Sequence, residues 1–567
     1  MQKKTLNEIV NQIQSNVHNH DYTSCVEVLI NAIEQYPNEN KLKLNLANIY
    51  KILGDATNAK DIYMSLLKTE YKSIAYNNLS LIYLEQGDVG KSIEHAQKAL
   101  RYENNYSDAK FNLALGLFEN KEFLESLNIC KDLVDHDGYK HKANELQIRI
   151  QQIICDWSRY KETQRLLESN QITVHPFLHI SHVMNEEKNY INAKKWSAQT
   201  YNDEQSNKIT HSSKTIKLGF LCGEIRNHPT FNLIKNFFRH IDKDIFSMYV
   251  FSYDHDVYEK KYIENDFEEF IDITNLNSFE AKENIKKYNL DILIDLTTII
   301  SHNRIDIIDR DVAKKIIAYL AFPGTTGNVV YDYILTDKVV TPEIQQKYYE
   351  ETFLYLPTTY QINNGEINID LNNMRQDNNL PKDKIILGCL NQSFKLDPLL
   401  FNTWIEILES NRNTCLWILD EGEEMKRNIV NFVNNRIETN RIIFAEKLSY
   451  KEHLMRIQHI DLALDTRIYN GHTTTIEMLQ AGVPVITLKG NHFASRVSAS
   501  ILNAFGMSEL IATNMNEYKE RIIDTTKSIE NINSLKKRVE NNLKNSKLLN
   551  LKSFAEEFEK TILSIIT

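Results

Sequence analysis

The first 150 residues of the chain repeat with a period of about 34 residues. Small residues stand at the same place in four successive segments, at Cys25, Ala59, Ser92 and Ser126. Bulky residues recur in register with them, at Tyr50, Tyr83 and Leu117. One segment of this length cannot bury its own apolar face, so stacked segments must share a continuous core. The repeat therefore predicts an elongated helical superhelix.

Two of these segments, "NLANIYKILGDATNAKDIY" and "NLSLIYLEQGDVGKSIEHA", resemble the tetratricopeptide pattern, with Gly54 and Gly87 in the turns between their helices. A third, "NLALGLFENKEFLESLNIC", resembles it with Lys121 at that turn. The resemblance implies an α-solenoid over residues 1–150. Such a solenoid is either a scaffold without a ligand or a groove for a partner polypeptide, and we favour the groove.

Length, charge and cysteine content limit the class of protein. At 567 residues the chain is too long for one hydrophobic core, and its net charge of −10 argues against a nucleic-acid surface. Six scattered cysteines without zinc-type spacing favour reduced thiols. The polar N-terminus lacks the apolar centre of a signal peptide, and no run reaches the roughly 20 apolar residues of a membrane helix. We therefore expect a cytoplasmic protein with no membrane span and no nucleic-acid partner.

From Ile216 onward, short β-branched and aromatic runs alternate with helical stretches. The first set is "IKLGFLCGEI", "FSMYVFSYD", "LDILIDLTT" and "KKIIAYLAFPG". The second set follows residue 383: "DKIILGCLNQ", "NTCLWILDEG", "NRIIFAE", "HIDLALDT" and "GVPVITLKG". This alternation predicts parallel sheets with crossover helices. The predicted fold class is therefore α + α/β, with a solenoid followed by two Rossmann-like lobes.

The same reading divides the chain behind the solenoid. The predicted parts are a helical linker at 151–212, an N-terminal lobe at 213–345, an inter-lobe connection at 346–382, a C-terminal lobe at 383–546 and a C-terminal helix at 547–567. We expect the last helix to pack back across the joint between the lobes. Ligands of such sheets bind beyond the C-terminal ends of the strands, so the functional residues should lie there.

The stretch "DLALDTRIYNGHTTTIEMLQAG" leads from a buried strand into a helix. Gly471, His472, Thr473 and Thr474 therefore lie at a helix N-terminus, where free backbone N–H groups and the helix dipole favour an anion. This arrangement predicts a diphosphate cradle without a Walker lysine, and Glu477 one turn later could accept the hydroxyls of a ribose. The alternative is a plain capping box, because Thr474 and Glu477 have the Thr-x-x-Glu spacing.

Other strand ends carry polar residues of the same kind. They are Gln392 and Lys395 in "NQSFKLDP", His453 and Arg456 on one face of the next helix, His228 before Pro229, and Pro323, Gly324 and Thr325 in a small-residue loop. A lysine at a strand end could stabilise the charge of a pyrophosphate leaving group. The alternatives are a solvated lysine in a loop and, for His228, a helix cap or a core group.

These segments together resemble the O-linked N-acetylglucosamine transferases of glycosyltransferase family 41, in their bacterial form. The resemblance rests on "NHPTFNL", "AFPGTTGNVVYDYILTD", "NQSFKLDP", "RIIF", "LALDTRIYNGHTTTIEMLQAGVPVITLKG" and "ASRVSASIL" in the family's order, with "CDWSRY" ahead of them. It covers nearly the whole chain. It implies tetratricopeptide repeats followed by a GT-B glycosyltransferase.

The resemblance also implies roles for the residues of the C-terminal lobe. Lys395 would bind the diphosphate and stabilise the departing nucleotide, and Gln392 would hold the same region. His472, Thr473 and Thr474 would form the phosphate cradle.

Further roles concern the nucleotide and the acceptor side. Glu477 would contact the ribose, and His453 and Arg456 would flank the base and phosphate. His228 would face the sugar and the acceptor. The family uses no metal, so we expect no metal site and read the acidic motifs at 254–256 and 309–311 as surface charges.

The sequence also departs from the family. Many bacterial relatives carry a Gly-His-Thr loop after the strand that here reads "DILIDLTTIISHNR". This chain has Thr298, Ile299 and Ile300 there, with His302 displaced by a few residues. We therefore expect the loop at 297–304 to give the acceptor side of the site a geometry different from that of those relatives. A lysine that animal relatives place before the His453 helix reads Tyr450 here.

The expected function is inverting, metal-independent transfer of a sugar from a nucleotide donor to a Ser or Thr of a protein held by the repeats. UDP-N-acetylglucosamine is the default donor by resemblance, as a co-substrate and not a bound cofactor. One alternative keeps the scaffold but uses a GDP-sugar or an asparagine acceptor. Another is a non-catalytic binding protein with relic lobes. A bacterial surface protein such as flagellin or an adhesin is the expected acceptor.

Overall fold

The computed structural model describes residues 4–18, 21–136, 138–200, 215–300, 303–365 and 378–566. Three parts of the sequence-based predictions lie outside these residues: the end of the helical linker at 201–212, His302, and positions 366–377 of the inter-lobe connection. The chain divides into two compact units. One comprises Met1–Ile150 with Leu276–Ala281, and the other comprises Gln151–Asn275 with Lys282–Thr567.

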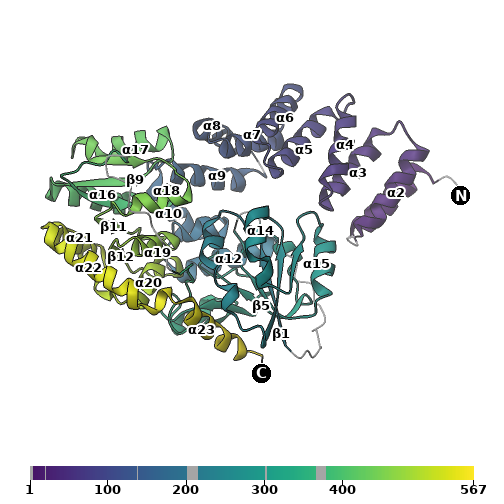
Figure 1. The fold of residues 1–567 in the computed structure, drawn as a ribbon. Coiled ribbons are helices and arrows are strands. Elements are labelled where there is room, and N and C mark those ends of the chain that lie inside the picture. Colours follow the sequence, from purple (N-terminus) through teal and green to yellow (C-terminus); the bar gives the residue numbers. More distant parts are fainter. Residues whose placement is uncertain are drawn as a thin grey trace. The chain divides into compact units, whose positions relative to one another are not determined.

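The first unit is a row of antiparallel helices in which each of the first seven packs against the next (Figure 1). The helices are α1 (Leu6–His18), α2 (Tyr22–Gln35), α3 (Asn40–Ile52), α4 (Ala56–Leu66), α5 (Lys72–Glu85), α6 (Val89–Tyr102), α7 (Ser107–Glu119), α8 (Phe123–Leu133) and α9 (Lys140–Ile153). The predicted α-solenoid is confirmed. The small residues of the repeat, Cys25, Ala59, Ser92 and Ser126, are all fully buried where helices meet.

The turns of the solenoid explain its glycines. Gly54 and Gly87 adopt φ values of 79° and 77°, in the left-handed region that glycine enters at low cost. Lys121 occupies the corresponding turn of the third repeat with φ of 64°, so this turn carries backbone strain. The second helix of a repeat then begins with an aspartate cap, and the side chains of Asp55 and Asp88 accept from backbone N–H groups three residues on.

The second unit begins with the described part of the helical linker, which contains α10 (Tyr160–Glu168), α11 (Pro176–Ile180) and α12 (Glu186–Thr200). Glu186 at the start of α12 is buried and binds both lobes. Its carboxylate accepts from the Tyr349 hydroxyl of the N-terminal lobe and, at 3.0 Å, from the Phe493 backbone N–H of the C-terminal lobe. Burial raises the pKa of Glu186 to about 7. The linker is therefore part of the joint between the lobes.

The N-terminal lobe is a parallel seven-stranded sheet in the order β3-β2-β1-β4-β5-β6-β7. Its strands are β1 (Ile216–Cys222), β2 (Phe246–Ser252), β3 (Glu269–Asp272), β4 (Leu290–Asp295), β5 (Ala313–Ala318), β6 (Tyr333–Thr336) and β7 (Thr352–Tyr355), with helices α13 (Pro229–Ile234), α14 (Val257–Ile263) and α15 (Ser278–Lys286). The predicted connection at 346–382 therefore contains a strand of this sheet, β7.

The C-terminal lobe is a parallel six-stranded sheet in the order β10-β9-β8-β11-β12-β13. Its strands are β8 (Ile385–Cys389), β9 (Thr414–Leu419), β10 (Ile442–Ala445), β11 (Leu462–Leu464), β12 (Val485–Leu488) and β13 (Ile511–Ala512). Its helices are α16 (Pro398–Ser410), α17 (Glu423–Val433), α18 (Tyr450–Ile457), α19 (Thr473–Gln480), α20 (Val497–Phe505), α21 (Met515–Thr526) and α22 (Ile529–Asn545). Both sheets have the Rossmann strand order, so the prediction of two Rossmann-like lobes is confirmed.

The C-terminal helix α23 (Leu551–Leu563) follows the C-terminal lobe but packs on the N-terminal lobe. The rings of Phe554 and Phe558 lie 5.7 and 5.1 Å from that of Phe237, and the Glu557 carboxylate accepts from the Thr358 hydroxyl at 2.7 Å. The expectation that this helix packs back across the joint is confirmed. Among the described helices, none is both long and apolar enough to cross a bilayer.

Candidate active site

The strand order places the candidate residues at one edge of each sheet. In the C-terminal lobe the order reverses between β8 and β11, and a crevice opens at such a point beyond the strand C-terminal ends. Lys395 follows β8 and Gly471 follows β11. In the N-terminal lobe the reversal lies between β1 and β4, and His228 follows β1. Helices α13 and α19, which begin beside His228 and His472, contact each other.

Lys395 ends a short 3-10 helix, η6 (Ser393–Lys395), and lies against the loop after β11. Its ammonium donates to the Asn470 carbonyl at 2.9 Å and to Asn391 Oδ1 at 3.4 Å, and it lies 4.7 Å from the centroid of the Tyr469 ring. Burial lowers the pKa of Lys395 to about 8. The structure thus brings Lys395 to the His472–Thr474 turn, where its charge is held without a direct ion pair to a carboxylate in the described residues.

A buried carboxylate shapes the turn before α19. Asp465 accepts from the Gly471 N–H at 2.6 Å, the Thr466 N–H at 2.8 Å and the Thr487 hydroxyl at 2.6 Å. A Cβ at Gly471 would lie 2.6 Å from Thr474 Oγ1, so only glycine fits. Because Asp465 already takes the Gly471 N–H, the N–H groups left for an anion are those of the following residues, at the first turn of α19.

Thr473 and Thr474, at the start of α19, do not form a capping box. Helix α19 begins at Thr473, with His472 at the cap position and no capping side chain among the described residues. The Thr474 hydroxyl donates to Asn391 Oδ1 at 2.7 Å, which links the loop after β11 to the loop after β8. The capping-box alternative for Thr474 and Glu477 is therefore wrong. Thr473 is half-buried at the first position of the helix.

His472 is a neutral histidine in contact with the same aromatic residue as Lys395. Its ring stacks on Tyr469 with centroids 4.8 Å apart and an interplanar angle of 21°. Burial, and then the charge of Lys395, lower the pKa of His472 well below 6.5. Its Nε2 is buried and has no hydrogen-bond partner within the described part of the chain. Within the residues that the structure describes, this buried nitrogen is therefore unsatisfied.

Glu477 and His453 lie together one turn further in. The His453 Nε2 atom is 3.7 Å from the Glu477 carboxylate, and the Tyr450 hydroxyl also hydrogen-bonds this carboxylate. Arg456 is almost fully buried, donates to the Glu446 carbonyl and to His453 Nδ1, and lies over the Trp417 ring. Arg456 thus fixes the orientation of the His453 ring through Nδ1, and the other ring nitrogen of His453 faces the Glu477 carboxylate.

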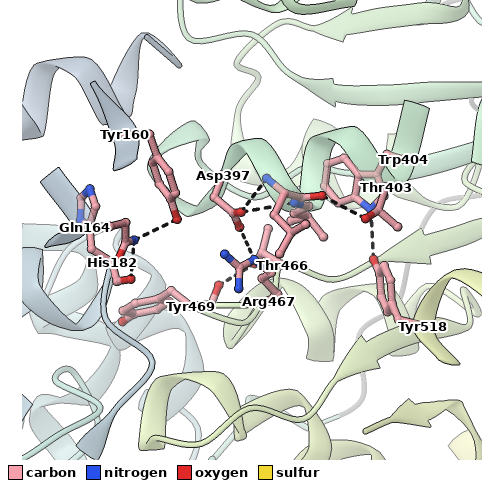
Figure 2. A network of polar contacts seen from close by, with 12 residues as sticks. Tyr160, Gln164, His182, Asp397, Thr403, Trp404, Thr466, Arg467, Tyr469 and Tyr518 are labelled. Carbon is pink, nitrogen blue, oxygen red and sulfur yellow. Dashed lines mark hydrogen bonds and ion pairs between the residues drawn. The ribbon is translucent and has the colours of Figure 1, made fainter. Parts of the chain in front are cut away.

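The helical linker is joined to the same loops (Figure 2). Arg467, in the loop after β11, pairs with Asp397 at 2.8 Å and also donates to the hydroxyl oxygen of Tyr160 in α10. The Gln164 amide donates to the Tyr160 hydroxyl at 2.9 Å and to the His182 carbonyl at 2.8 Å. Asp397 in turn caps α16, the helix that follows Lys395.

His228 opens α13 as predicted, with Pro229 in the first helical position. Its Nδ1 accepts from the Thr230 N–H at 3.4 Å and lies 2.8 Å from the buried Glu224 carboxylate. The side chain of His228 is about a quarter exposed, at 28%. His228 therefore caps α13, which was one of the alternatives predicted for it, and part of its imidazole stays exposed to solvent.

The loop after β4 contains the departure from the family pattern. Asp295 is buried and accepts from the Thr297 and Thr298 N–H groups at 3.0 and 2.9 Å and from the Tyr331 hydroxyl at 2.7 Å. Thr298 has φ of 53°, which is strained for a β-branched residue. Thr298 thus has a backbone conformation that glycine would adopt at lower cost.

The small-residue loop at Pro323, Gly324 and Thr325 is buried. The Thr325 hydroxyl donates to Glu351 at 2.7 Å, and the neighbouring Thr326 donates to the same carboxylate through its N–H and hydroxyl. Thr325 therefore holds its own loop, and its hydroxyl is already engaged.

The acidic motifs at 254–256 and 309–311 have protein partners. Asp254 pairs with Arg226 at 2.8 Å and Asp311 pairs with Lys286 at 2.6 Å, while Asp256 caps α14. Within the described residues, no group of three or more His, Cys, Asp or Glu side chains is arranged to hold a metal ion.

Three residues of the site were missed from the sequence: Asn391, Asp465 and Tyr469. Asn391 lies beside the predicted Gln392, but Gln392 is exposed while Asn391 is buried and bonded to both site loops. Their signal was present. Each follows a buried strand at a reversal of strand order, which is where polar and aromatic residues should have been considered first.

Comparisons with known proteins identify the family and the fold. The family model described as glycosyl transferase family 41 matches residues 154–370 and 366–558, and the tetratricopeptide repeat model matches residues 41–72 and 74–106. A solved structure named as a mutant O-GlcNAc transferase of Thermobaculum terrenum covers 93% of this chain and 97% of its own, with a TM-score of 0.68 and 20% identity. That likeness shows the fold.

Two curated relatives are similar in sequence. The probable UDP-N-acetylglucosamine–peptide N-acetylglucosaminyltransferase SEC of Arabidopsis thaliana is 31% identical over 58% of this chain, and a UDP-N-acetylglucosamine–peptide N-acetylglucosaminyltransferase of Caenorhabditis elegans is 22% identical over 72%. The chain spans 34% and 47% of the lengths of these relatives. Because the family model matches well over half of the residues, the chain belongs to glycosyl transferase family 41.

Proposed function

We propose that this protein transfers N-acetylglucosamine from UDP-N-acetylglucosamine to a serine or threonine hydroxyl of a protein acceptor. The observation that carries the proposal is that the Lys395 ammonium and the Thr474 hydroxyl, in the first turn of α19, both donate to Asn391 Oδ1. The names of the relatives support a peptide acceptor and this donor. The repeats support a polypeptide partner, because solenoids of this kind offer extended binding surfaces.

The proposed reaction is a single inverting displacement. The acceptor oxygen attacks the anomeric carbon, the bond from that carbon to the diphosphate oxygen breaks, and the hydroxyl proton is lost to a base or to water. About two negative charges build up on the departing diphosphate. Lys395 and the N–H groups at the start of α19 would bind that charge, each charge-assisted hydrogen bond contributing about 1.5–3 kcal/mol. With these donors in place we propose that no metal ion and no resident cofactor takes part.

The remaining residues would recognise the substrates. Glu477 would bind the ribose hydroxyls, and His453 would flank the base while Arg456 holds it in place. His472, neutral and with a free Nε2, would line the diphosphate site together with Thr473 and Thr474. His228, partly exposed in the N-terminal lobe, would face the sugar and the acceptor.

The acceptor and compartment are further parts of the proposal. All six cysteines are buried and unpaired, which supports a reducing compartment, and we place the reaction in the cytoplasm. A bacterial surface protein modified before export, such as flagellin or an adhesin, is the proposed acceptor class.

Intact-mass analysis of such an acceptor, incubated with a panel of UDP- and GDP-sugars, tests the proposal. We expect a mass gain of one N-acetylhexosamine, its loss in Lys395→Met, and about tenfold weaker UDP binding by calorimetry in Glu477→Gln. Glu259→Gln, a buried carboxylate in α14, is the matched control. A mass gain from a GDP-sugar would show that the donor is different from the one proposed, and a sugar on asparagine would show that the acceptor residue is different. If the protein binds neither UDP nor GDP, it is a binding protein with non-catalytic lobes.

A further inference from the structure

Tyr469 contacts both polar groups that the proposed function places on the diphosphate. The Lys395 ammonium lies 4.7 Å from the centroid of its ring, and the His472 ring stacks on it with centroids 4.8 Å apart. The Tyr469 side chain is 5% exposed, so it is fixed within the protein. No hydrogen bond of its hydroxyl is found among the described residues. The contacts are therefore made by the ring.

The ring is held from behind by the helical linker. Phe177 of α11 lies 5.5 Å from both Tyr469 and Phe394, and the latter two rings are 5.8 Å apart. Phe394 belongs to η6 together with Lys395. The Gln152 amide donates to the Phe394 carbonyl at 2.7 Å, which fixes the backbone next to the lysine. Phe177 and Gln152, which both precede Lys395 by more than two hundred residues, thus support the position of the lysine.

An aromatic face suits this place for an electrostatic reason. A ring attracts a cation through its quadrupole, but it carries no net charge that would compete with a diphosphate for the ammonium. A carboxylate in the same position would neutralise the lysine. The nearby carboxylate, Asp465, accepts hydrogen bonds from Gly471, Thr466 and Thr487. The lysine charge is thereby held in place and left available.

We propose that Tyr469 is a positioning residue for sugar transfer: its ring aligns the Lys395 ammonium with the His472 imidazole, and Phe177 of the helical linker keeps the ring in place. This inference rests on the proposed function. It makes the segment ahead of the two lobes part of the machinery that orients the catalytic lysine.

The test compares Tyr469→Leu, which removes the ring, with Tyr469→Phe, which keeps it. We expect Tyr469→Leu to lower kcat by about 100-fold with donor KM and UDP affinity little changed, because a displaced catalytic group mainly costs transition-state stabilisation. Tyr469→Phe should retain close to the full rate. Phe177→Leu should lower kcat by about tenfold. Tyr249→Leu, a ring on β2 that contacts Tyr288, is the matched control and should behave as the unchanged protein.

A second readout does not depend on turnover. Competitive acetylation of Lys395 across pH, followed by peptide mass spectrometry, should give a midpoint near 8 in the unchanged chain and in Tyr469→Phe, and a higher midpoint in Tyr469→Leu as the ammonium becomes hydrated. An unchanged kcat in Tyr469→Leu would overturn the proposal. Equal losses of kcat in Tyr469→Leu and Tyr469→Phe would overturn it too, as would a loss of UDP affinity in Tyr469→Leu that parallels the loss of kcat. If the unchanged chain transfers no sugar, the proposed function fails, and the acetylation midpoints still decide whether the ring holds the lysine.

Discussion

Replacing Lys395 by methionine should stabilise the protein while it abolishes transfer. Burial lowers the pKa of Lys395 from 10.5 to about 8 in the folded chain. Each tenfold change in a proton equilibrium corresponds to about 1.4 kcal/mol, so holding this lysine charged costs the folded state up to about 3 kcal/mol. Methionine has a similar length, carries no charge and packs well against the rings of Tyr469 and Phe394.

The pH dependence gives the prediction its sign. Below pH 8 the lysine is protonated in both the folded and the unfolded chain, and the full cost is present. Between pH 8 and about 10.5 the unfolded chain binds more protons than the folded chain, so the stability contributed by this group rises with pH. The advantage of Lys395→Met should therefore be largest near pH 7 and should fade as the pH approaches 10.5.

Urea unfolding followed by tryptophan fluorescence measures the difference, since Trp404 and Trp417 are buried in the same lobe. Lys395→Arg is the control, because its guanidinium stays charged through this range. A variant less stable than the unchanged chain at pH 7, or an advantage that stays constant up to pH 10.5, would refute the reasoning. Saturating UDP should reverse the order at pH 7, because only the lysine form gains the phosphate contact.

Two further predictions concern other parts of the chain. Lys121→Gly should raise the free energy of unfolding of the solenoid by about 1 kcal/mol, because it relieves a left-handed backbone, and Gly87→Ala should lower it by a similar amount; circular dichroism during urea unfolding measures both, and a destabilised Lys121→Gly would contradict the strain. Glu186 binds its proton more tightly in the folded chain, so the stability it contributes should be lost as pH rises from about 4.5 to 7, by about 3 kcal/mol in all. Glu186→Gln should remove that dependence in calorimetric scans, and an unchanged pH profile would exclude this carboxyl as its source.

The fold was predictable where residue patterns are long and regular. The solenoid followed from small residues one repeat apart, and the central strands followed from continuous apolar runs such as Ile385–Cys389. The edge strand Thr352–Tyr355 was missed because it is short and partly exposed, so its pattern does not differ from that of a loop. Short edge strands depend on pairing with a neighbour, and the sequence does not display that pairing.

The site was predictable in part for a related reason. The run from Gly471 to Thr474 identifies a helix start by its residue types alone. Asn391 and Tyr469 could be located at strand ends, but their roles could not be assigned, because these come from contacts between the loops after β8 and β11, which are far apart in the chain. The sequence placed Arg456 correctly on a helix face. Its burial follows from packing on Trp417 in strand β9, which the sequence does not display.

The position of helix α23 sets a practical limit on dividing this chain into separate lobes. Because Phe554 and Phe558 cover Phe237, the N-terminal lobe is completed by residues that follow the whole C-terminal lobe in the chain. During translation an aromatic patch on that lobe stays uncovered until α23 has been synthesised and has left the ribosome. A protein truncated before residue 551 would keep the patch uncovered permanently, and a partner that shields it would be needed for such a fragment to stay in solution.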